Sequence, residues 1–422
     1  MKKILTLSMA TLVALGMVGC APGGGDGASS DVTLVVSRWA GESSEAQTEL
    51  MKEFTAETGI KVQLDAIDYG QLQQKQTLSL SGPTAQYDLL MVHYTWLHQY
   101  IDEGWLAPVD EYLTDDALTG GDVDIADFAP SMIEHATVDG KFYGLPTNPA
   151  VPIFVYNEDL LDAAGLEVPT DWDSLLDVSK ALSEAGTGIA LPSSQAGSPP
   201  EIWNGFAHSL GGGIFDEAGA LAMDSDANVE AMEYWAELNK YAVTGSNNFN
   251  WQDVNTQIQL GDAALGIVLS GIAIQLEDPD NSRVVGQLGY APIPSPTGDL
   301  GFSTSSFFNW GVAANSEHPE EAFQLSAWLT SKVQLERLNL EIMPEVTART
   351  SVSANPDIIA KLPFLAAVSE ALSNSGVLPS DPNAPKLIDA LGTAMSDITV
   401  NGADAKAALK ALQDEFGPLY AG

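Results

Sequence analysis

The sequence predicts an α/β protein with two lobes, and three observations support this expectation. The 422 residues alternate short apolar runs of strand type with segments of helical periodicity. Hydrophobic residues make up 45% of the chain, so a sizeable core can be buried, and the length favours about two domains. Pro146 and Pro149 interrupt the pattern about a third of the way along, where the missing amide donors suit a crossover between two units and not a sheet interior.

The first unit opens with a β-α-β-α-β alternation. Its first helix carries Ala46, Leu50 and Phe54 at four-residue spacing and stops at Gly59, which is typical of an amphipathic helix with a glycine C-cap. The expected strands of this unit are 32–37, 61–67 and 87–92, and the expected helices are 42–58, 71–81 and 94–103.

From Asn157 onward the chain has the pattern of a second α/β unit. Thr170 with Asp173 predicts a capping box at the start of a helix that carries Trp172 and Leu175. The further strands expected are 142–145, 151–156, 263–269, 285–293 and 307–314, and the further helices are 201–210, 227–241, 319–330 and 333–340, with a mainly helical remainder to residue 416.

The first 19 residues predict a secretion signal, because Lys2 and Lys3 precede a mostly apolar run that is too short to span a bilayer. Met17-Val18-Gly19-Cys20 resembles the bacterial lipobox, although the lipobox prefers leucine where this chain has Met17. The resemblance implies a lipid on Cys20, the sole cysteine, followed by a flexible linker to residue 31. An ordinary signal peptide with an incidental cysteine is the alternative. We expect the mature chain outside the cytoplasmic membrane.

The chain is strongly acidic, with 17 Lys and Arg against 57 Asp and Glu. Removal of residues 1–19 takes away two lysines and no acid, so the formal net charge would move from −40 to −42. This balance excludes nucleic acid as a partner and disfavours anionic lipid surfaces. The acids are spread along the chain, as in adaptation to salty surroundings. A cation store is the alternative, but 115–127 lacks the glycine and terminal glutamate of an EF-hand loop. We expect no metal and no cofactor.

Several strings, in their order and spacing, resemble the extracellular solute-binding proteins of family 1, the receptors that deliver sugars to ATP-binding-cassette (ABC) importers. The strings are Trp-Ala-Gly-Glu at 39–42, Glu-Phe-Thr-Ala-Glu-Thr-Gly-Ile-Lys-Val at 53–62, Tyr-Asp-Leu-Leu-Met at 87–91, Gly-Trp-Leu-Ala-Pro-Val-Asp at 104–110, Gly-Lys-Phe-Tyr-Gly-Leu-Pro at 140–146 and Val-Tyr-Asn-Glu-Asp-Leu-Leu at 155–161.

This resemblance covers about residues 32–416 and implies the type II periplasmic-binding-protein fold, with two α/β lobes joined by hinge crossovers and a ligand cleft between them. The first lobe would take 32–145 plus 270–310, and the second lobe 146–269 plus 311–422. The resemblance implies capture of a ligand by lobe closure, delivery to the permease subunits of an ABC importer, and no catalytic activity.

A sugar presents hydroxyl groups and apolar C–H faces, so its receptor needs aromatic platforms and planar hydrogen-bonding groups. The side chains that follow predicted strands or stand at predicted crossovers are the candidates, because cleft loops meet at strand ends. They are Trp39, Glu42, His93, Tyr94, Trp96, Thr147, Asn148, Trp203, Asn204, Ser270, Gly271, Asn309 and Trp310, together with Arg349, whose stretch turns back toward the cleft in the family. Each aromatic candidate has packing as its alternative role, and Trp105, Trp172, Trp235 and Trp328 fit packing positions better.

The leading hypothesis is therefore a monomeric receptor for a sugar or sugar alcohol. A receptor of the same fold for a polyamine or another small solute stays open, since acids among aromatics also suit polyamines. A secreted carbohydrate-active enzyme would need paired carboxylates across a cleft. The sequence has no Gly-x-Ser-x-Gly elbow and no His-Glu-x-x-His motif, and its five histidines show no metal spacing.

Overall fold

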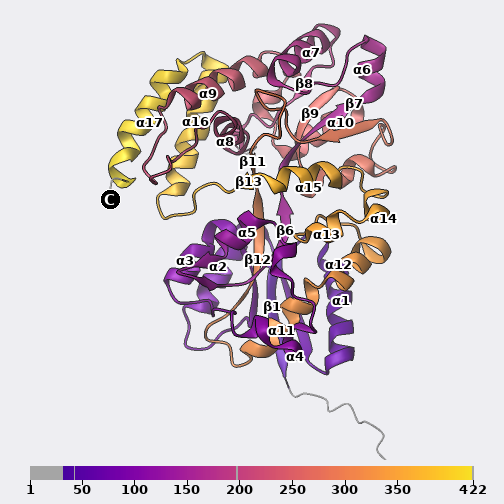
Figure 1. The fold of residues 1–422 in the computed structure, drawn as a ribbon, viewed down its shortest axis with the longest axis vertical. Coiled ribbons are helices and arrows are strands. Elements are labelled where there is room, and N and C mark those ends of the chain that lie inside the picture. Colours follow the sequence, from indigo (N-terminus) through magenta and orange to yellow (C-terminus); the bar gives the residue numbers. More distant parts are fainter. Residues whose placement is uncertain (1–31, 42, 196–197, 421–422) are drawn as a thin grey trace, which may run out of the picture.

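The computed structural model describes residues 32–41, 43–195 and 198–420, which form two lobes stacked along the long axis of the molecule (Figure 1). The predicted signal peptide, Cys20, the linker and Glu42 lie outside the described residues. Within the described part, no helix is both long and apolar enough to cross a membrane.

The first lobe is built on a five-stranded sheet with the order β2-β1-β3-β12-β6. β1 runs parallel to β2 and β3, whereas β12 is antiparallel to β3 and β6. Leu50 and Phe54 of the first helix are buried, as their spacing predicts, and Gly59 ends that helix with a φ of 79°. The elements that open the lobe are β1 (Thr33–Trp39), α1 (Ser43–Thr58), β2 (Lys61–Ile67), α2 (Tyr69–Leu80), β3 (Leu89–His93), α3 (Tyr94–Asp102), α4 (Asp116–Thr119), α5 (Pro130–His135), β4 (Thr137–Val138), β5 (Lys141–Phe142) and β6 (Leu145–Ala150).

The second lobe has a four-stranded sheet with the order β10-β7-β9-β8. The capping box that opens α7 is made by Asp171 and Ser174, and not by Thr170 and Asp173, because the Asp171 carboxylate accepts from the Ser174 amide at 2.8 Å. The elements of this lobe are β7 (Pro152–Asn157), α6 (Glu158–Ala164), α7 (Trp172–Ala185), β8 (Ile189–Ala190), α8 (Pro199–Ser209), α9 (Asp226–Asn239), α10 (Trp251–Leu260), β9 (Leu265–Leu269), a 3-10 helix (Ser270–Glu277), β10 (Leu288–Ala291), α16 (Ala384–Asn401) and α17 (Ala405–Tyr420).

The observed strand pairing differs from the predicted lobe boundaries at two points. Residues 270–310 were assigned to the first lobe, but β10 within them pairs with β7 of the second sheet. The segment after residue 310 was assigned to the second lobe, yet α11 packs on α4 of the first lobe. The returning segment contains β12 (Ser306–Val312), which begins just before residue 310, then α11 (Pro319–Leu329), α12 (Lys332–Arg337), a π-helix (Leu338–Ile342), α13 (Thr350–Ser353) and α14 (Pro356–Ile359). It is followed by α15 (Leu365–Ser373), which packs on β10 and β7 of the second sheet.

The chain therefore passes between the lobes at three places. The first crossing joins β6 to β7, close to the predicted Pro146–Pro149 break, and both prolines lie in β6, an edge strand, where proline is tolerated. The other two crossings run side by side, where β11 (Ser303–Thr304) pairs in parallel with β13 (Ser375–Gly376). Ser270–Gly271 and Asn309–Trp310, predicted as the second and third crossovers, lie in the 3-10 helix and within β12.

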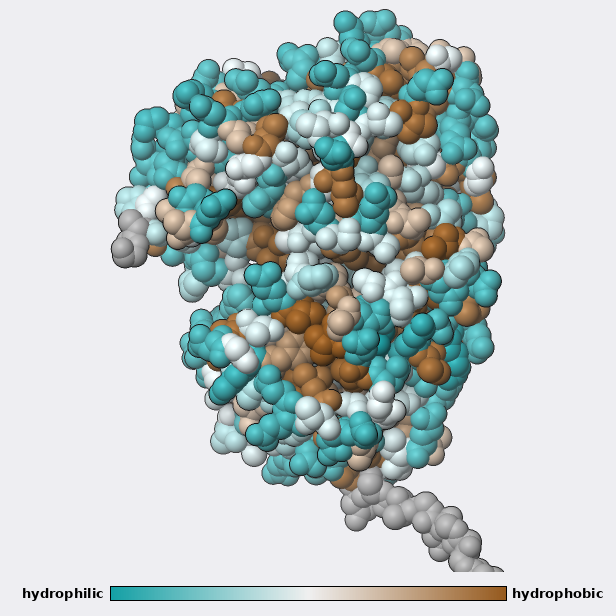
Figure 2. All heavy atoms as spheres, in the orientation of Figure 1, coloured by the Kyte–Doolittle hydropathy of each residue, from teal (hydrophilic) through white to brown (hydrophobic). Residues whose placement is uncertain are grey.

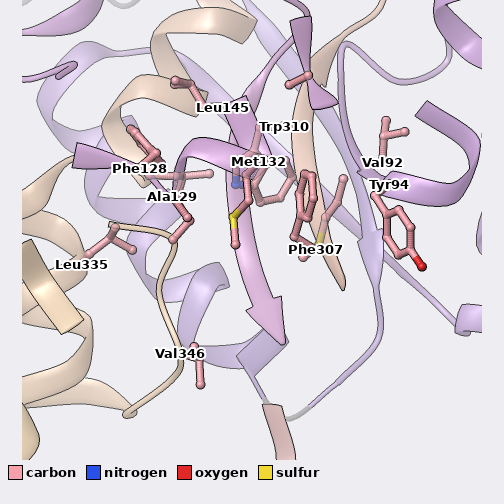
Figure 3. Packing of buried hydrophobic residues seen from close by; sticks show 14 of the residues in the cluster. Val92, Tyr94, Phe128, Ala129, Met132, Leu145, Phe307, Trp310, Leu335 and Val346 are labelled. Carbon is pink, nitrogen blue, oxygen red and sulfur yellow. The ribbon is translucent and has the colours of Figure 1, made fainter. Parts of the chain in front are cut away.

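The first-lobe core is continuous from its sheet to the helices of the returning segment. Figure 3 shows Phe307 and Trp310 of β12 among buried side chains that include Met132 of α5 and Leu335 of α12. β12 pairs with β3 and β6 of the first sheet, and Arg337 of α12 pairs with Glu53 of α1, so β12 and α12 belong to the first lobe and return the chain to the sheet that β1 began.

Candidate functional site

A cavity of about 410 Å³ lies where the two lobes meet, at the carboxyl ends of β1 and β6. This volume is within the range of small-molecule sites. In Figure 2 the outline narrows between the lobes, and apolar side chains reach the surface of the lower lobe near this waist. The cavity is lined by Trp39, Gly41, Asn148, Pro149, Ala150, Leu269, Ser270, Gly271, Ile272, Ile274, Gln275, Ser306, Phe308, Met343, Pro344, Glu345, Val346 and Phe364.

Two aromatic rings form a wall of this pocket. The rings of Trp39 and Phe308 are stacked, with centroids 6.4 Å apart and planes 18° apart. The Nε1–H of Trp39 is buried and has no hydrogen-bond partner within the described residues. A buried donor without a partner is costly, so a hydroxyl group of a ligand would satisfy it. The wall offers an apolar face with one donor at its edge, which suits the C–H face and hydroxyl edge of a sugar.

The polar groups of the pocket come from both lobes. The amide Nδ2 of Asn148 donates to Oε2 of Glu345 at 3.4 Å, and the Oδ1 of Asn148 accepts from the Thr147 hydroxyl at 3.0 Å. Asn148 has a φ of 44°, a left-handed conformation that asparagine tolerates better than most residues. The Oγ of Ser270 accepts from the Val151 amide at 3.0 Å and so ties the 3-10 helix to the first crossing.

A second aromatic cluster adjoins the pocket through Phe308. The imidazole of His93 lies 4.8 Å from the Phe308 ring and 5.0 Å from the Trp96 ring, and the Tyr69 ring lies 5.9 Å from Trp96 (centroid distances). Burial and the neighbouring His135 lower the pKa of His93 to about 3, so this imidazole is neutral at physiological pH. The Nε1–H of Trp96 is buried without a partner among the described residues.

Glu201 of α8, in the second lobe, acts electrostatically on two tyrosines near this cluster. Burial raises the pKa of Glu201 to about 8. Desolvation in the cleft, together with the charge of Glu201, raises the pKa of Tyr69 to about 12, although the Tyr69 side chain is 49% exposed. The same carboxyl acts on Tyr94. The aromatic cluster and Glu201 therefore lie within electrostatic reach of each other across the boundary between the lobes.

Four of the predicted site residues line the pocket: Trp39, Asn148, Ser270 and Gly271. Thr147 is buried and orients the Asn148 amide through its hydroxyl. His93 and Trp96 belong to the adjoining cluster and reach the pocket only through Phe308.

The structure places three other predicted aromatic or amide residues inside the cores. Trp203 is fully buried in the second lobe, and its Nε1–H donates to the Asn228 carbonyl at 3.3 Å. Trp310 is buried in the first-lobe core, and Tyr94 is buried with its ring stacked 5.9 Å from Phe307. None of the three lines the pocket.

The remaining three candidates also lie away from the pocket lining. The amide of Asn204 donates to the Thr304 hydroxyl at 3.0 Å and so joins α8 to the second crossing. Asn309 is fully buried in β12, with no partner for its side-chain amide within the described residues. The guanidinium of Arg349 is buried against the Asp127 carboxylate, 3.3 Å away, and holds the returning segment on the first lobe.

Sequence reasoning missed Tyr69, Glu201, Phe308 and Glu345. Tyr69 follows β2, so the rule that selected Trp39 after β1 could also have found Tyr69. Phe308 and Glu345 stand one and four positions from selected residues, but the strand pleat and the irregular segment 343–346 decide which neighbour faces the cavity. Only the folded chain reveals that choice.

The family model of the bacterial extracellular solute-binding proteins matches residues 40–336, more than half of the chain. The chain belongs to this family. Its members are binding proteins and not enzymes, and those named as ABC transporter components act outside the cytoplasm. The resemblance stated from the sequence strings, and the two-lobed fold it implied, are confirmed.

Three relatives illustrate the range of this family. A solute-binding protein from Agrobacterium radiobacter K84, solved with ribitol, is 26% identical with a TM-score of 0.77, and the match covers 92% of this chain and 99% of that one. The mannitol-binding protein of Pseudomonas aeruginosa is 25% identical over 75% of this chain and 72% of its own length. A probable amino-acid ABC transporter periplasmic-binding protein of Sinorhizobium fredii is 27% identical over 79% of this chain and 76% of its own.

Proposed function

We propose that this solute-binding protein captures a sugar alcohol or a small sugar in the pocket between its lobes and delivers it to the membrane subunits of an ABC importer. The observation that carries the proposal is the wall of Trp39 and Phe308 beside the polar groups of Asn148 and Glu345 in a cavity of about 410 Å³. The ribitol and mannitol bound by relatives support the same ligand class.

Lobe closure follows from the position of the pocket. Its lining comes from β1 and β6 on one side and from the 3-10 helix that follows β9 on the other, so a ligand that touches both sides favours the closed arrangement. The closed form would be the one that the permease recognises, as expected for hinge-bending receptors. We expect the protein to be a monomer and to release its ligand chemically unchanged.

Isothermal titration calorimetry tests the ligand class. Ribitol, mannitol, erythritol and maltose are titrated into the purified protein, with spermidine and a set of amino acids as competing classes. We expect heat of binding with at least one alditol or sugar, and none with spermidine or amino acids. Binding of only spermidine or an amino acid would overturn the ligand class and leave the fold intact.

A matched pair of variants tests the location of the site. Trp39→Ala removes one ring of the aromatic wall and should weaken binding about fivefold or more, because stacking on an aromatic face contributes on the order of 1 kcal/mol or more. Trp105→Ala is the control, since Trp105 is also a partly buried first-lobe tryptophan but does not line the pocket. Equal affinities for the two variants would move the ligand elsewhere.

We also propose that Cys20 carries a lipid that tethers the protein to the outer face of the cytoplasmic membrane. Support comes from the apolar leader and from Met17-Val18-Gly19-Cys20. Cys20→Ser should move the protein from the membrane fraction to the soluble fraction. A variant that stays with the membrane would contradict the anchor.

A further inference from the structure

The pocket continues into a second chamber. A cavity of about 600 Å³ adjoins the pocket and shares three of its lining residues, Ile274, Gln275 and Pro344. The walls of this chamber come from α10 and the 3-10 helix of the second lobe, from Pro344, and from Leu362, which follows α14. Each of the two volumes lies within the range of small-molecule sites, about 300 to 1,000 Å³. The cleft therefore has room for a ligand that extends beyond the aromatic wall.

The second chamber is polar, and no aromatic ring is among its described lining residues. The Glu277 carboxylate accepts from the Tyr290 hydroxyl at 2.6 Å. The Asp278 carboxylate accepts from the Asp280 amide at 2.9 Å, and the Lys361 ammonium donates to a backbone carbonyl. These charged groups serve the local structure, and the remaining polar side chains of the described lining are amides.

Three amide side chains of α10 hold Gln275 at the junction of the two chambers. The Gln275 Oε1 accepts from the Gln252 Nε2 at 2.8 Å and from the Asn255 Nδ2 at 3.5 Å, and the Gln259 Nε2 donates to the Gln275 backbone carbonyl at 2.7 Å. These three amides share one face of α10, since helix positions three and four apart are neighbours. The Asn255 Nδ2 also donates to the Ile272 carbonyl at 2.8 Å. Because a carbonyl only accepts, this bond fixes which atoms of the network are donors.

The network leaves the amide donors of Gln275 to a ligand. The Oε1 is bound to α10, so the Nε2 group of the same planar amide points away from these donors, and it has no acceptor among the described residues. In the second chamber, the Oε1 of Gln252 and the Oδ1 of Asn281 likewise receive no bond from the described part of the chain. A donor group at the junction and two acceptors beyond it suit the oxygens and hydroxyl groups of a sugar residue.

We propose that Gln275 and the second chamber form a subsite for a glycosyl unit, so that the ligand is an alditol or sugar that carries one further sugar residue. The inference rests on the proposed function and deepens it, because the first unit is the polyol already assigned to the wall of Trp39 and Phe308. The Gln275 Nε2 donates near the linkage between the two units, and Gln252 and Asn281 accept from hydroxyl groups of the second unit. A single alditol reaches only the first chamber and forgoes these bonds.

Isothermal titration calorimetry on the purified protein compares ligands of one and two units, namely glucitol with maltitol and glucose with maltose. Each added hydrogen bond strengthens binding by about two- to tenfold, so in at least one pair the two-unit ligand should bind at least about tenfold more tightly. Gln275→Glu keeps an acceptor for α10 but replaces the NH₂ group, and should reduce this ratio about fivefold or more. Gln257→Glu is the control, because it makes the same change of charge on α10 at a position that lines neither chamber.

Asn281→Trp keeps the subsite testable if the Gln275 variant folds poorly. Asn281 is an exposed lining residue, so a larger side chain there fills the second chamber without displacing the core. This variant should lose most of the gain from the second unit, while its affinity for the one-unit ligand changes less than about twofold.

The outcomes separate the two proposals. Binding of glucitol or glucose without any gain for maltitol or maltose overturns the second subsite and leaves the proposed function standing. An unchanged ratio in both Gln275→Glu and Asn281→Trp, or an equal fall of the ratio in Gln257→Glu, also overturns the subsite. A protein that binds none of the four ligands and binds spermidine instead contradicts the proposed function, and the subsite with it.

Discussion

The sequence and the structure assign Arg349 different roles. The sequence predicts a ligand-binding residue, whereas in the structure Arg349 is buried and connects the start of α13 to the first lobe. Arg349 is 1% exposed, and its guanidinium donates to the carbonyls of Thr330 and Asp122, both at 2.6 Å. It also pairs with the carboxylate of Asp127 and lies 5.0 Å from the Phe128 ring. These contacts bind the start of α13 to the first lobe.

Arg349→Met removes these contacts while it keeps a side chain of similar length. Breaking a buried ion pair by removal of one partner costs about 3 to 5 kcal/mol, and each bond to a charged donor about 1.5 to 3 kcal/mol. Since the bonds share one group, we expect a total loss of about 3 to 5 kcal/mol in the free energy of unfolding. The melting temperature should fall by about 4 to 6 °C.

Urea unfolding followed by tryptophan fluorescence measures this loss, and calorimetry measures ligand affinity. Arg337→Met is the matched control, because Arg337 also pairs with an acid, Glu53, but is 31% exposed. The control should lose no more than about 1 kcal/mol. Wild-type stability of Arg349→Met together with a tenfold loss of affinity would refute the structural interpretation and restore Arg349 to the ligand site.

Three further predictions concern other parts of the molecule. Gly144→Ala should lower the free energy of unfolding by about 2 kcal/mol or more, because a Cβ at this φ of 148° would lie 2.5 Å from the Trp310 carbonyl oxygen. Gly140→Ala, which has open space around its Cβ, should lower it by only about 1 kcal/mol, and urea unfolding measures both losses. Between pH 4.5 and about 8 the folded state keeps a proton on Glu201 that the unfolded state releases, so the free energy of unfolding falls as pH rises through this range. Glu201→Gln should therefore be more stable than the wild type by roughly 2 to 4 kcal/mol at pH 8.5 and equal to it near pH 4. Parallel profiles of stability against pH for the two proteins would contradict this. Trp203→Phe should lower the melting temperature but change alditol affinity less than twofold, since the indole is fully buried in the second lobe; a larger loss of affinity would return this residue to the site.

The order of elements in the first lobe was predictable because it depends on local patterns. The strand at 61–67 matches β2 at both ends, and the helix with Leu50 and Phe54 matches α1 within one residue. Periodicity and glycine caps are properties of neighbouring residues, so a single sequence shows them. The assignment of segments to lobes failed at 270–310 and after 311, because nothing local states which sheet a strand such as β10 will join.

The prediction of site residues also succeeded where the signal was local and failed where it was not. Trp39 and Asn148 were found because strand ends and crossovers meet in the cleft of such folds. Trp203 and Trp310 were indistinguishable from platform residues in the sequence, since an aromatic residue suits a core and a ligand face equally well. Glu345 reaches the pocket only after the chain returns to the first lobe, a contact that spans more than 190 residues from Asn148 and leaves no local signal.

A crystal structure of the protein with the tightest-binding alditol tests the central claim most directly. We predict ligand density between the lobes, with the carbon chain against Trp39 and Phe308, one hydroxyl accepting from the Trp39 Nε1–H, and others bonded to Asn148 and Glu345. Density at a site that none of these four residues touches would contradict the account, even if the affinity for the alditol is high.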